Sequence, residues 1–119
     1  MSYFNKAKEL FRMIENGKML EALDLFYHPD VIVIQADGVK RIGVEANKNY
    51  EKDFLNNIQE IFGAELLSIT SDEERHITMV EYWVHIKFKD GTRKKYEEVS
   101  VHYWKDDKII KERFYEGKS

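Results

Sequence analysis

The chain has 119 residues, 43% of them hydrophobic, and its 19 Lys and Arg against 22 Asp and Glu give a formal net charge of -3. This balance predicts one folded domain over residues 1–119, and it argues against a nucleic-acid partner, because phosphate binding requires clustered Lys and Arg. Since cysteine is absent, no disulfide, thiolate metal site or cysteine nucleophile can form.

The first elements in the chain are predicted to be helices. Apolar residues recur at intervals of three and four over residues 4–14, which predicts an amphipathic helix that ends at Gly17. The same period continues over residues 19–26 and predicts a second, short helix, which Pro29 stops.

A short strand and a long helix are predicted next. The β-branched run at residues 31–34 predicts a strand that ends at the turn Asp37-Gly38. Helical spacing returns over residues 44–62 and predicts the longest helix of the chain, with Gly63 as its C-terminal cap.

The rest of the chain alternates with period two, which predicts antiparallel strands. The predicted strands are residues 66–70, 77–89, 93–105 and 109–115. Hairpin turns are predicted at Asp90-Gly91 and Asp106-Asp107. Helices followed by a meander of long strands indicate an α+β architecture.

A two-residue turn at Asp90-Gly91 would place Glu81 opposite Ser100 and Trp83 opposite Glu98. One face of the sheet then carries Val80, Tyr82, Val84, Ile86, Phe88, Val99, Val101 and Tyr103. The other carries Glu81, Trp83, His85, Glu98, Ser100, His102 and Trp104. Periodicity alone favours the apolar face under the helices and the mixed face in solvent. Two tryptophans on a solvent face would, however, indicate a site or an interface.

Several segments resemble the nuclear transport factor 2-like superfamily, in particular the SnoaL-like polyketide cyclases and the ketosteroid isomerases. They are residues 15–18, 22–31, 41–43, 99–104, 108–110 and 114–115, together with Ala46. The resemblance implies a cone-shaped, curved antiparallel sheet whose concave face is covered by three helices from the N-terminal half. It also implies a pocket on the mixed face and a homodimer through the apolar face.

The isomerase-like members of that superfamily carry groups that this chain lacks. Their carboxylate base and tyrosine donor fall on Ile34 and Leu10, or on Gln35 and Phe11, depending on how the chain is matched. The acid that serves them as a second donor falls on Ser100. Steroid isomerisation is therefore not expected.

The predicted pocket wall contains a candidate acid-base group. Glu81 would lie diagonally beside His102, at about 7–8 Å along the ladder, and a carboxylate can orient an imidazole that transfers a proton near neutral pH. Glu98 is a second candidate carboxylate, and a merely structural polar cluster is the alternative. The expected ligand contacts are Trp83, His85, Ser100, Trp104, Glu112 and Phe114.

The register of the last strand is open in the sequence, because Ile109 and Ile110 are adjacent and suggest a bulge. Either Glu112 and Phe114 point inward, or Lys111, Arg113 and Tyr115 do. The resemblance favours Glu112 and Phe114.

We therefore expect a small-molecule binder or a cofactor-independent acid-base enzyme, with a non-catalytic protein-interaction or dimerisation module as the alternative. No metal site is expected, since His85 and His102 would lie about 20 Å apart along the ladder. No apolar run approaches the roughly 20 residues that span a bilayer, and residues 1–10 lack the apolar stretch of a signal peptide. A cytoplasmic protein without a membrane partner is expected.

Overall fold

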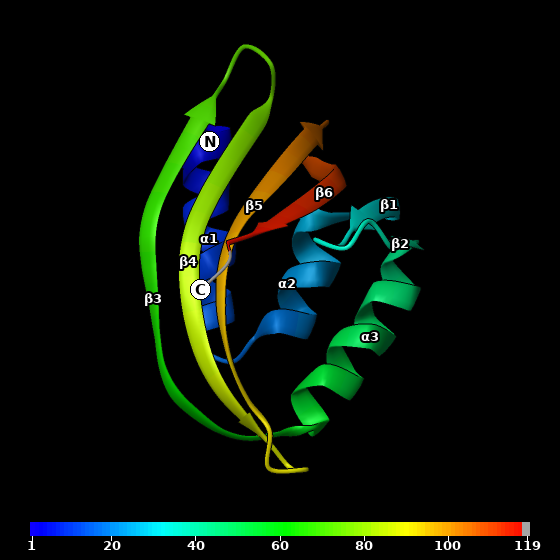
Figure 1. Cartoon of the computed structure of the whole chain (residues 1–119). Helices are drawn as coiled ribbons and strands as arrows, with labels where there is room; N and C mark the ends of the chain where they lie inside the picture. Colours follow the sequence, from blue (N-terminus) through cyan, green and yellow to red (C-terminus); the bar gives the residue numbers. More distant parts are fainter. Residues whose placement is uncertain (118–119) are drawn as a thin grey trace.

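The computed structural model describes residues 1–117, which form three helices and a six-stranded sheet (Figure 1). In chain order the elements are α1 (Tyr3–Glu15), α2 (Met19–Phe26), β1 (Tyr27–Ile34), β2 (Lys40–Ile42), α3 (Val44–Asn56), β3 (Ile58–Asp72), β4 (Ile77–Phe88), β5 (Arg93–Lys105) and β6 (Lys108–Glu116). None of the helices within residues 1–117 is long and apolar enough to cross a membrane.

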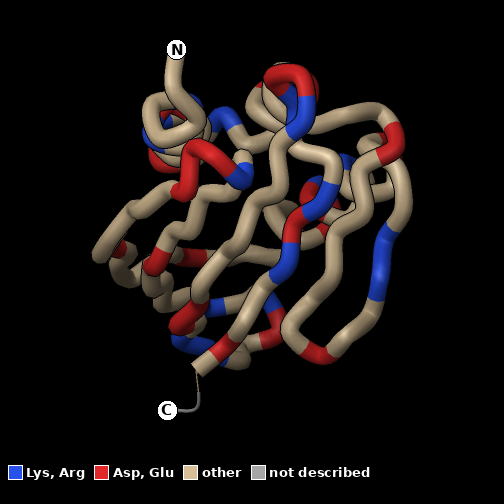
Figure 2. Tube along the Cα trace, turned by 90° about the horizontal axis from the view of Figure 1, so that it is seen from above, with Lys and Arg blue, Asp and Glu red and all other residues tan. Residues whose placement is uncertain are grey.

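The sheet has the order β2-β1-β6-β5-β4-β3, and its long strands curve around the helices (Figure 1). All neighbouring strands are antiparallel except β1 and β6, which run parallel. The predicted α+β fold with helices on the concave face is confirmed, and the single parallel pair makes the sheet mixed. Acidic and basic residues are interspersed along the trace, as Figure 2 shows.

The first two predicted helices are confirmed. The side chain of Ser2 accepts a hydrogen bond from the backbone N–H of Asn5 and so caps α1. The strand after α2 begins earlier than predicted, at Tyr27. Pro29 therefore lies inside β1, between Tyr27 and Ile32, where the register with β6 shifts; such an irregularity tolerates a residue that cannot donate.

The third helix is shorter than predicted, because its last turn and the following residues form a strand instead. α3 ends at Asn56, and Ile58 opens β3. The carbonyl of Asn57 accepts the backbone N–H of Lys89 at 2.8 Å, which ties this point of the chain to the β4–β5 hairpin. Gly63 lies within β3, where a Cβ would come 3.1 Å from the Trp83 ring. Pairing with β4 thus overrides the local helical period.

The predicted register of β4 and β5 is wrong by one residue. Val80 lies opposite Ser100, and Thr78 lies opposite His102. The turn is longer than predicted: Phe88 donates to the carbonyl of Thr92 at 2.8 Å across a loop that ends at Gly91, whose φ is +93°. A three-residue hairpin loop of this kind places its last residue in the left-handed region.

This slip exchanges the two faces of β4, since side chains alternate along a strand. Val80 and Ile86 are buried on the concave face, whereas Trp83 lies on the convex face with Lys95 over its ring at 4.9 Å. The second hairpin has the predicted two-residue turn, with positive φ at both Asp106 and Asp107.

The hydrophobic core lies between the concave face and the helices. It is made by residues from α1, α2 and four strands: Leu10, Phe11, Ala22, Leu23, Phe26, Tyr27, Val31, Val33, Val80, Trp104 and Ile109. Trp104 packs between Tyr3 of α1 and Phe26 of α2, with ring centroids 5.5 and 6.2 Å away. Trp104, which was predicted to line the pocket with core packing as the alternative, is therefore a core residue.

Candidate functional site

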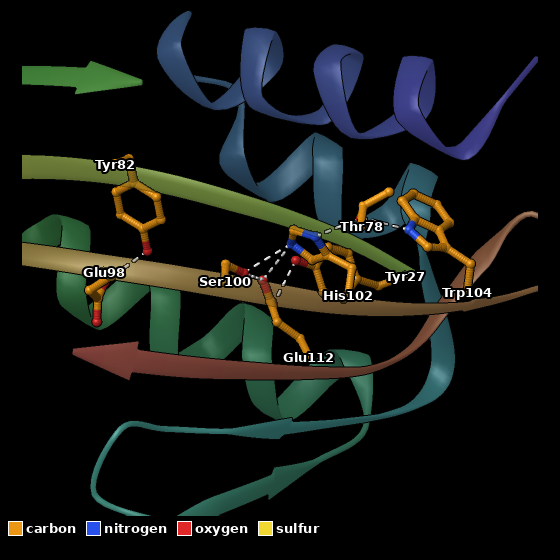
Figure 3. Close-up of polar contacts among 8 residues, drawn as sticks. All are labelled: Tyr27, Thr78, Tyr82, Glu98, Ser100, His102, Trp104 and Glu112. Carbon is orange, nitrogen blue, oxygen red and sulfur yellow. Dashed lines mark hydrogen bonds and ion pairs between the residues drawn. The ribbon is translucent and has the colours of Figure 1, made fainter. Parts of the chain in front are cut away.

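A chain of buried polar side chains crosses the concave face beneath α1 and α2 (Figure 3). The register places Thr78 of β4 opposite His102 of β5, and His102 opposite Glu112 of β6. Ser100 lies two residues before His102, on the same face, and Tyr27 reaches the chain from β1. Thr78, Ser100 and His102 are completely buried, and Glu112 is 5% exposed.

His102 has a protein partner on each ring nitrogen. Its Nδ1 is 3.0 Å from Thr78 Oγ1, and its Nε2 is 3.0 Å from both Ser100 Oγ and Glu112 Oε2. Since the ring is fully buried and both nitrogens are paired, His102 cannot touch a ligand in this conformation. It can act only through its neighbours.

Glu112 is the acceptor at the other end of this chain. Tyr27 donates to Oε1 at 2.7 Å, and Ser100 donates to Oε2 at 2.6 Å, beside His102. Burial alone would raise the Glu112 pKa, but the hydrogen bond from His102, the charge of that ring when protonated and the two hydroxyl donors together lower it. Glu112 is therefore a buried carboxyl group whose pKa is held below its ordinary value.

A second carboxyl, that of Glu98, lies on β5 two residues before Ser100 and nearer the solvent. The phenol of Tyr82 donates to Glu98 Oε1 at 2.8 Å (Figure 3), and both side chains are partly buried. Burial raises the pKa of Glu98, and the single hydrogen bond from Tyr82 only partly opposes this rise. The charges of Glu116 and Glu112 raise it further.

α3 contributes a third carboxyl, Glu51, which the sequence analysis did not single out. Burial raises its pKa from 4.5 to about 7, the charges of Glu112 and Glu98 add to the rise, and Arg41 opposes it. Glu51 lies four residues after the buried Asn47, on the inward face of α3. This spacing is a signal that could have identified Glu51.

The structure brings together six of the predicted site residues on the concave side. They are Glu98, Ser100, His102, Trp104, Glu112 and Phe114. Glu112 and Phe114 point inward, and the register with β5 shifts next to Ile110, where the bulge was expected. The catalytic role of Glu98 and the ligand contact of Phe114 stay predictions, whereas Ser100, His102, Trp104 and Glu112 are too buried for direct contact with a ligand in this conformation.

The other three predicted site residues lie on the convex face. The predicted pairing of Glu81 with His102 is wrong, because the register slip turns Glu81, Trp83 and His85 away from the helices. Glu81 accepts from Ser68 Oγ at 3.1 Å, and Trp83 donates to Glu65 at 3.1 Å.

Sequence reasoning also missed Thr78, Tyr82 and Tyr27. A three-residue loop at residues 89–91 would have placed Thr78 and Tyr82 on the inner face. Tyr27 has no such signal, since its direction depends on where α2 gives way to β1.

Within residues 1–117, no group of three or more His, Asp and Glu side chains is placed to hold a metal ion. A surface groove shares no residue with the polar chain; it is lined by His28, Asp30, Lys105, Asp106, Lys108 and Ile110.

No protein-family model and no curated protein matches the sequence. Solved structures do match it. A candidate SnoaL-like polyketide cyclase from Mesorhizobium loti is 21% identical, with a TM-score of 0.84 over 97% of this chain and 99% of that one. An NTF2-like protein of unknown function from Burkholderia pseudomallei is 13% identical, with a TM-score of 0.81 over 98% and 92% of the two chains. The chain has a nuclear transport factor 2-like fold.

The resemblance inferred from the sequence is thus confirmed at the level of the fold. Another match is a protein with a ketosteroid isomerase-like fold from Catenulispora acidiphila, in complex with trimethylamine. It is 13% identical, with a TM-score of 0.66 over 81% of this chain and 73% of that one.

The substitution Glu51→Gln tests the burial of this carboxyl. The folded protein keeps the Glu51 proton up to pH about 7, whereas the unfolded chain releases it near the ordinary value, so this group costs stability as the pH rises between them. E51Q removes that cost. Relative to the parent protein, its free energy of unfolding should therefore rise by about 2 kcal/mol between pH 5 and pH 8.

Urea unfolding at the two pH values measures the effect. The matched control is E45Q, at an exposed glutamate in the first turn of the same helix, which should leave the pH dependence unchanged. Parallel stability curves for E51Q and the parent protein would contradict the raised pKa.

Proposed function

We propose that this protein binds a small, partly apolar molecule at the half-buried end of the concave face and moves a proton of that ligand without a cofactor. The supporting observation is the contrast between neighbouring carboxyls: Glu112 has three donors, whereas Glu98 has one phenol. Environments that drive the pKa values of neighbouring carboxyls apart are typical of acid-base sites. The ligand is proposed to be small and partly apolar because aromatic rings lie beside the half-buried carboxyl at this end of the concave face.

Aromatic rings beside Glu98 provide the apolar part of the proposed site. Tyr96 lies two residues from Glu98 on the same face, and Phe54 of α3 packs against it with ring centroids 6.0 Å apart. Phe88 completes the cluster at 5.8 Å from Phe54. Apolar walls with a few convergent polar groups are typical of small-molecule sites.

In the proposed mechanism the buried and half-buried carboxyls have different tasks. Glu98, when ionised, takes a proton from a carbon next to a ligand carbonyl, while protonated Glu51 donates its proton to the carbonyl oxygen, giving an enol. Glu112 and His102 are too buried to touch the ligand and act by their fixed charge and hydrogen bonds. Groups with a pKa near the working pH are the most effective in such transfers.

The match to candidate polyketide cyclases and to a candidate isomerase from Bacillus subtilis supports a proton-transfer function. The bound trimethylamine of the Catenulispora acidiphila protein supports a small-molecule site. A soluble, cytoplasmic protein remains our expectation for its location.

Exchange of the α-hydrogens of 2-tetralone in D2O, followed by proton NMR, tests the proposed reaction. The parent protein should accelerate the exchange, and Glu98→Gln should reduce that acceleration at least about tenfold, because one general base is worth roughly 10²–10⁴ in rate. Glu97→Gln is the matched control, since Glu97 is the next residue and faces the convex side.

Equal exchange rates for E98Q and E97Q would contradict the role of Glu98. If the parent protein gives no acceleration but 2-tetralone shifts the amide signals of Tyr82 and Tyr96, the protein is a binder without this chemistry. No acceleration and no shifts of these amide signals would favour the alternative expected from the sequence, a non-catalytic protein-interaction or dimerisation module.

The convex face is a second candidate site, for association with another copy of the chain. It exposes 43% of Met79 and 51% of Tyr115, and Phe62 lies beside His85 on the same face. Exposed large apolar side chains gathered on one face are typical of interfaces. The homodimer was predicted through an apolar face of eight residues, but its five members on β4 face the helices. Val99, Val101 and Tyr103 of β5 remain on the convex face, and Val101 is only 5% exposed.

Sedimentation at micromolar concentration tests this homodimer. We expect the parent protein to sediment as a dimer and Met79→Lys to shift it to monomer, because a charge would be buried at the contact. Leu25→Lys is the control, at a position of α2 that is 52% exposed. A parent protein that is already monomeric would contradict the proposed interface.

A further inference from the structure

Trp104 makes a polar contact that the proposed reaction does not use. Its indole Nε1–H donates to Thr78 Oγ1 at 2.9 Å (Figure 3). The ring is 3% exposed and packs in the core, so it does not contact a ligand. An indole nitrogen can only donate, which fixes the direction of this hydrogen bond.

That direction constrains the next group, because Thr78 carries a single hydroxyl hydrogen. Its oxygen already accepts from Trp104, and its other partner is His102 Nδ1 at 3.0 Å. A hydroxyl oxygen can accept twice, but Thr78 is completely buried, and a second acceptance would leave its own hydrogen without an acceptor among the hydrogen bonds of residues 1–117. Donation to Nδ1 leaves no polar atom of Thr78 unsatisfied. Nδ1 is then an acceptor and carries no proton.

The proton of the neutral imidazole must then be on Nε2, which faces Ser100 Oγ and Glu112 Oε2. Ser100 gives its own hydrogen to Glu112 at 2.6 Å and can accept from Nε2–H. Every donor in the chain therefore points from the indole toward the carboxylate.

We propose that Trp104 and Thr78 are positioning residues that hold His102 in its neutral Nε2–H tautomer, so that His102 donates to an ionised Glu112. This assignment does not depend on the proposed reaction or on any ligand. It adds to the site a one-way chain of hydrogen bonds, which begins in the hydrophobic core and ends at a charge.

The hydrogen-bonded chain from Trp104 to Glu112 also affects the carboxyls at the half-buried end of the concave face. The charge of Glu112 raises the pKa of both Glu51 and Glu98. A change at Trp104 would therefore reach these two carboxyls through Glu112, without any contact between the indole and the ligand.

Nitrogen-15 NMR of histidine-labelled protein at pH 7 tests this proposal, with the His102 signals assigned by their loss in H102Q. We expect Nδ1 in the range of an unprotonated nitrogen and Nε2 in the range of a protonated one. Trp104→Phe removes the donor but keeps an aromatic ring, and Thr78→Val removes the hydroxyl at the same volume. Either variant that retains a folded amide spectrum should lose this pattern.

Two controls separate positioning from packing. Thr78→Ser keeps the hydroxyl and should preserve the Nε2–H pattern. Trp83→Phe removes the indole donor of the convex face and should also preserve it. A parent protein with a proton on Nδ1, alone or on both nitrogens, would overturn the proposal, as would an unchanged pattern in folded W104F and T78V.

Discussion

A carboxylate buried under the helices is the constraint around which this domain is arranged. Taking Glu112 out of water costs several kcal/mol, and removal of one partner of such a group typically costs about 3–5 kcal/mol. Its donors come from β1 and β5, so the parallel pairing of β1 with β6 and the register of β5 with β6 must both hold. The polar chain therefore specifies the middle of the sheet as well as a candidate site.

The concave face changes character along its length. At the end near Trp104, every polar atom in the hydrogen-bonded chain has a protein partner, and Thr78 and His102 are inaccessible. At the other end, Glu98 and Tyr82 are only partly buried and lie near the aromatic rings of α3. The inaccessible end contains the buried carboxyl Glu112, and the accessible end carries the groups to which we assign proton exchange with a ligand.

Much of the fold followed from sequence periodicity, and most of the residues on the concave face were identified, but their pairing was not. The alternation of apolar and polar residues located both β4 and β5. The loop between them is one residue longer than predicted, with Gly91 in the left-handed region, and the prediction therefore placed Glu81 on the wrong face. Ile58 and Ile61 fit a helical period locally, and only pairing with β4 makes them a strand. Tertiary contacts decided these points. By contrast, the adjacent Ile109 and Ile110 correctly marked the bulge that turns Glu112 inward.

The most direct test of this account is a carbon-13 NMR titration of the carboxyl carbons of Glu51, Glu98 and Glu112 in the parent protein. The account predicts ionisation of Glu112 below the ordinary glutamate value, of Glu98 above it and of Glu51 near pH 7. If all three carboxyls ionised together near the ordinary value, the environments would not differ and the concave face would be only a polar core. A Glu112 that stays protonated at neutral pH would contradict the direction of the whole hydrogen-bonded chain.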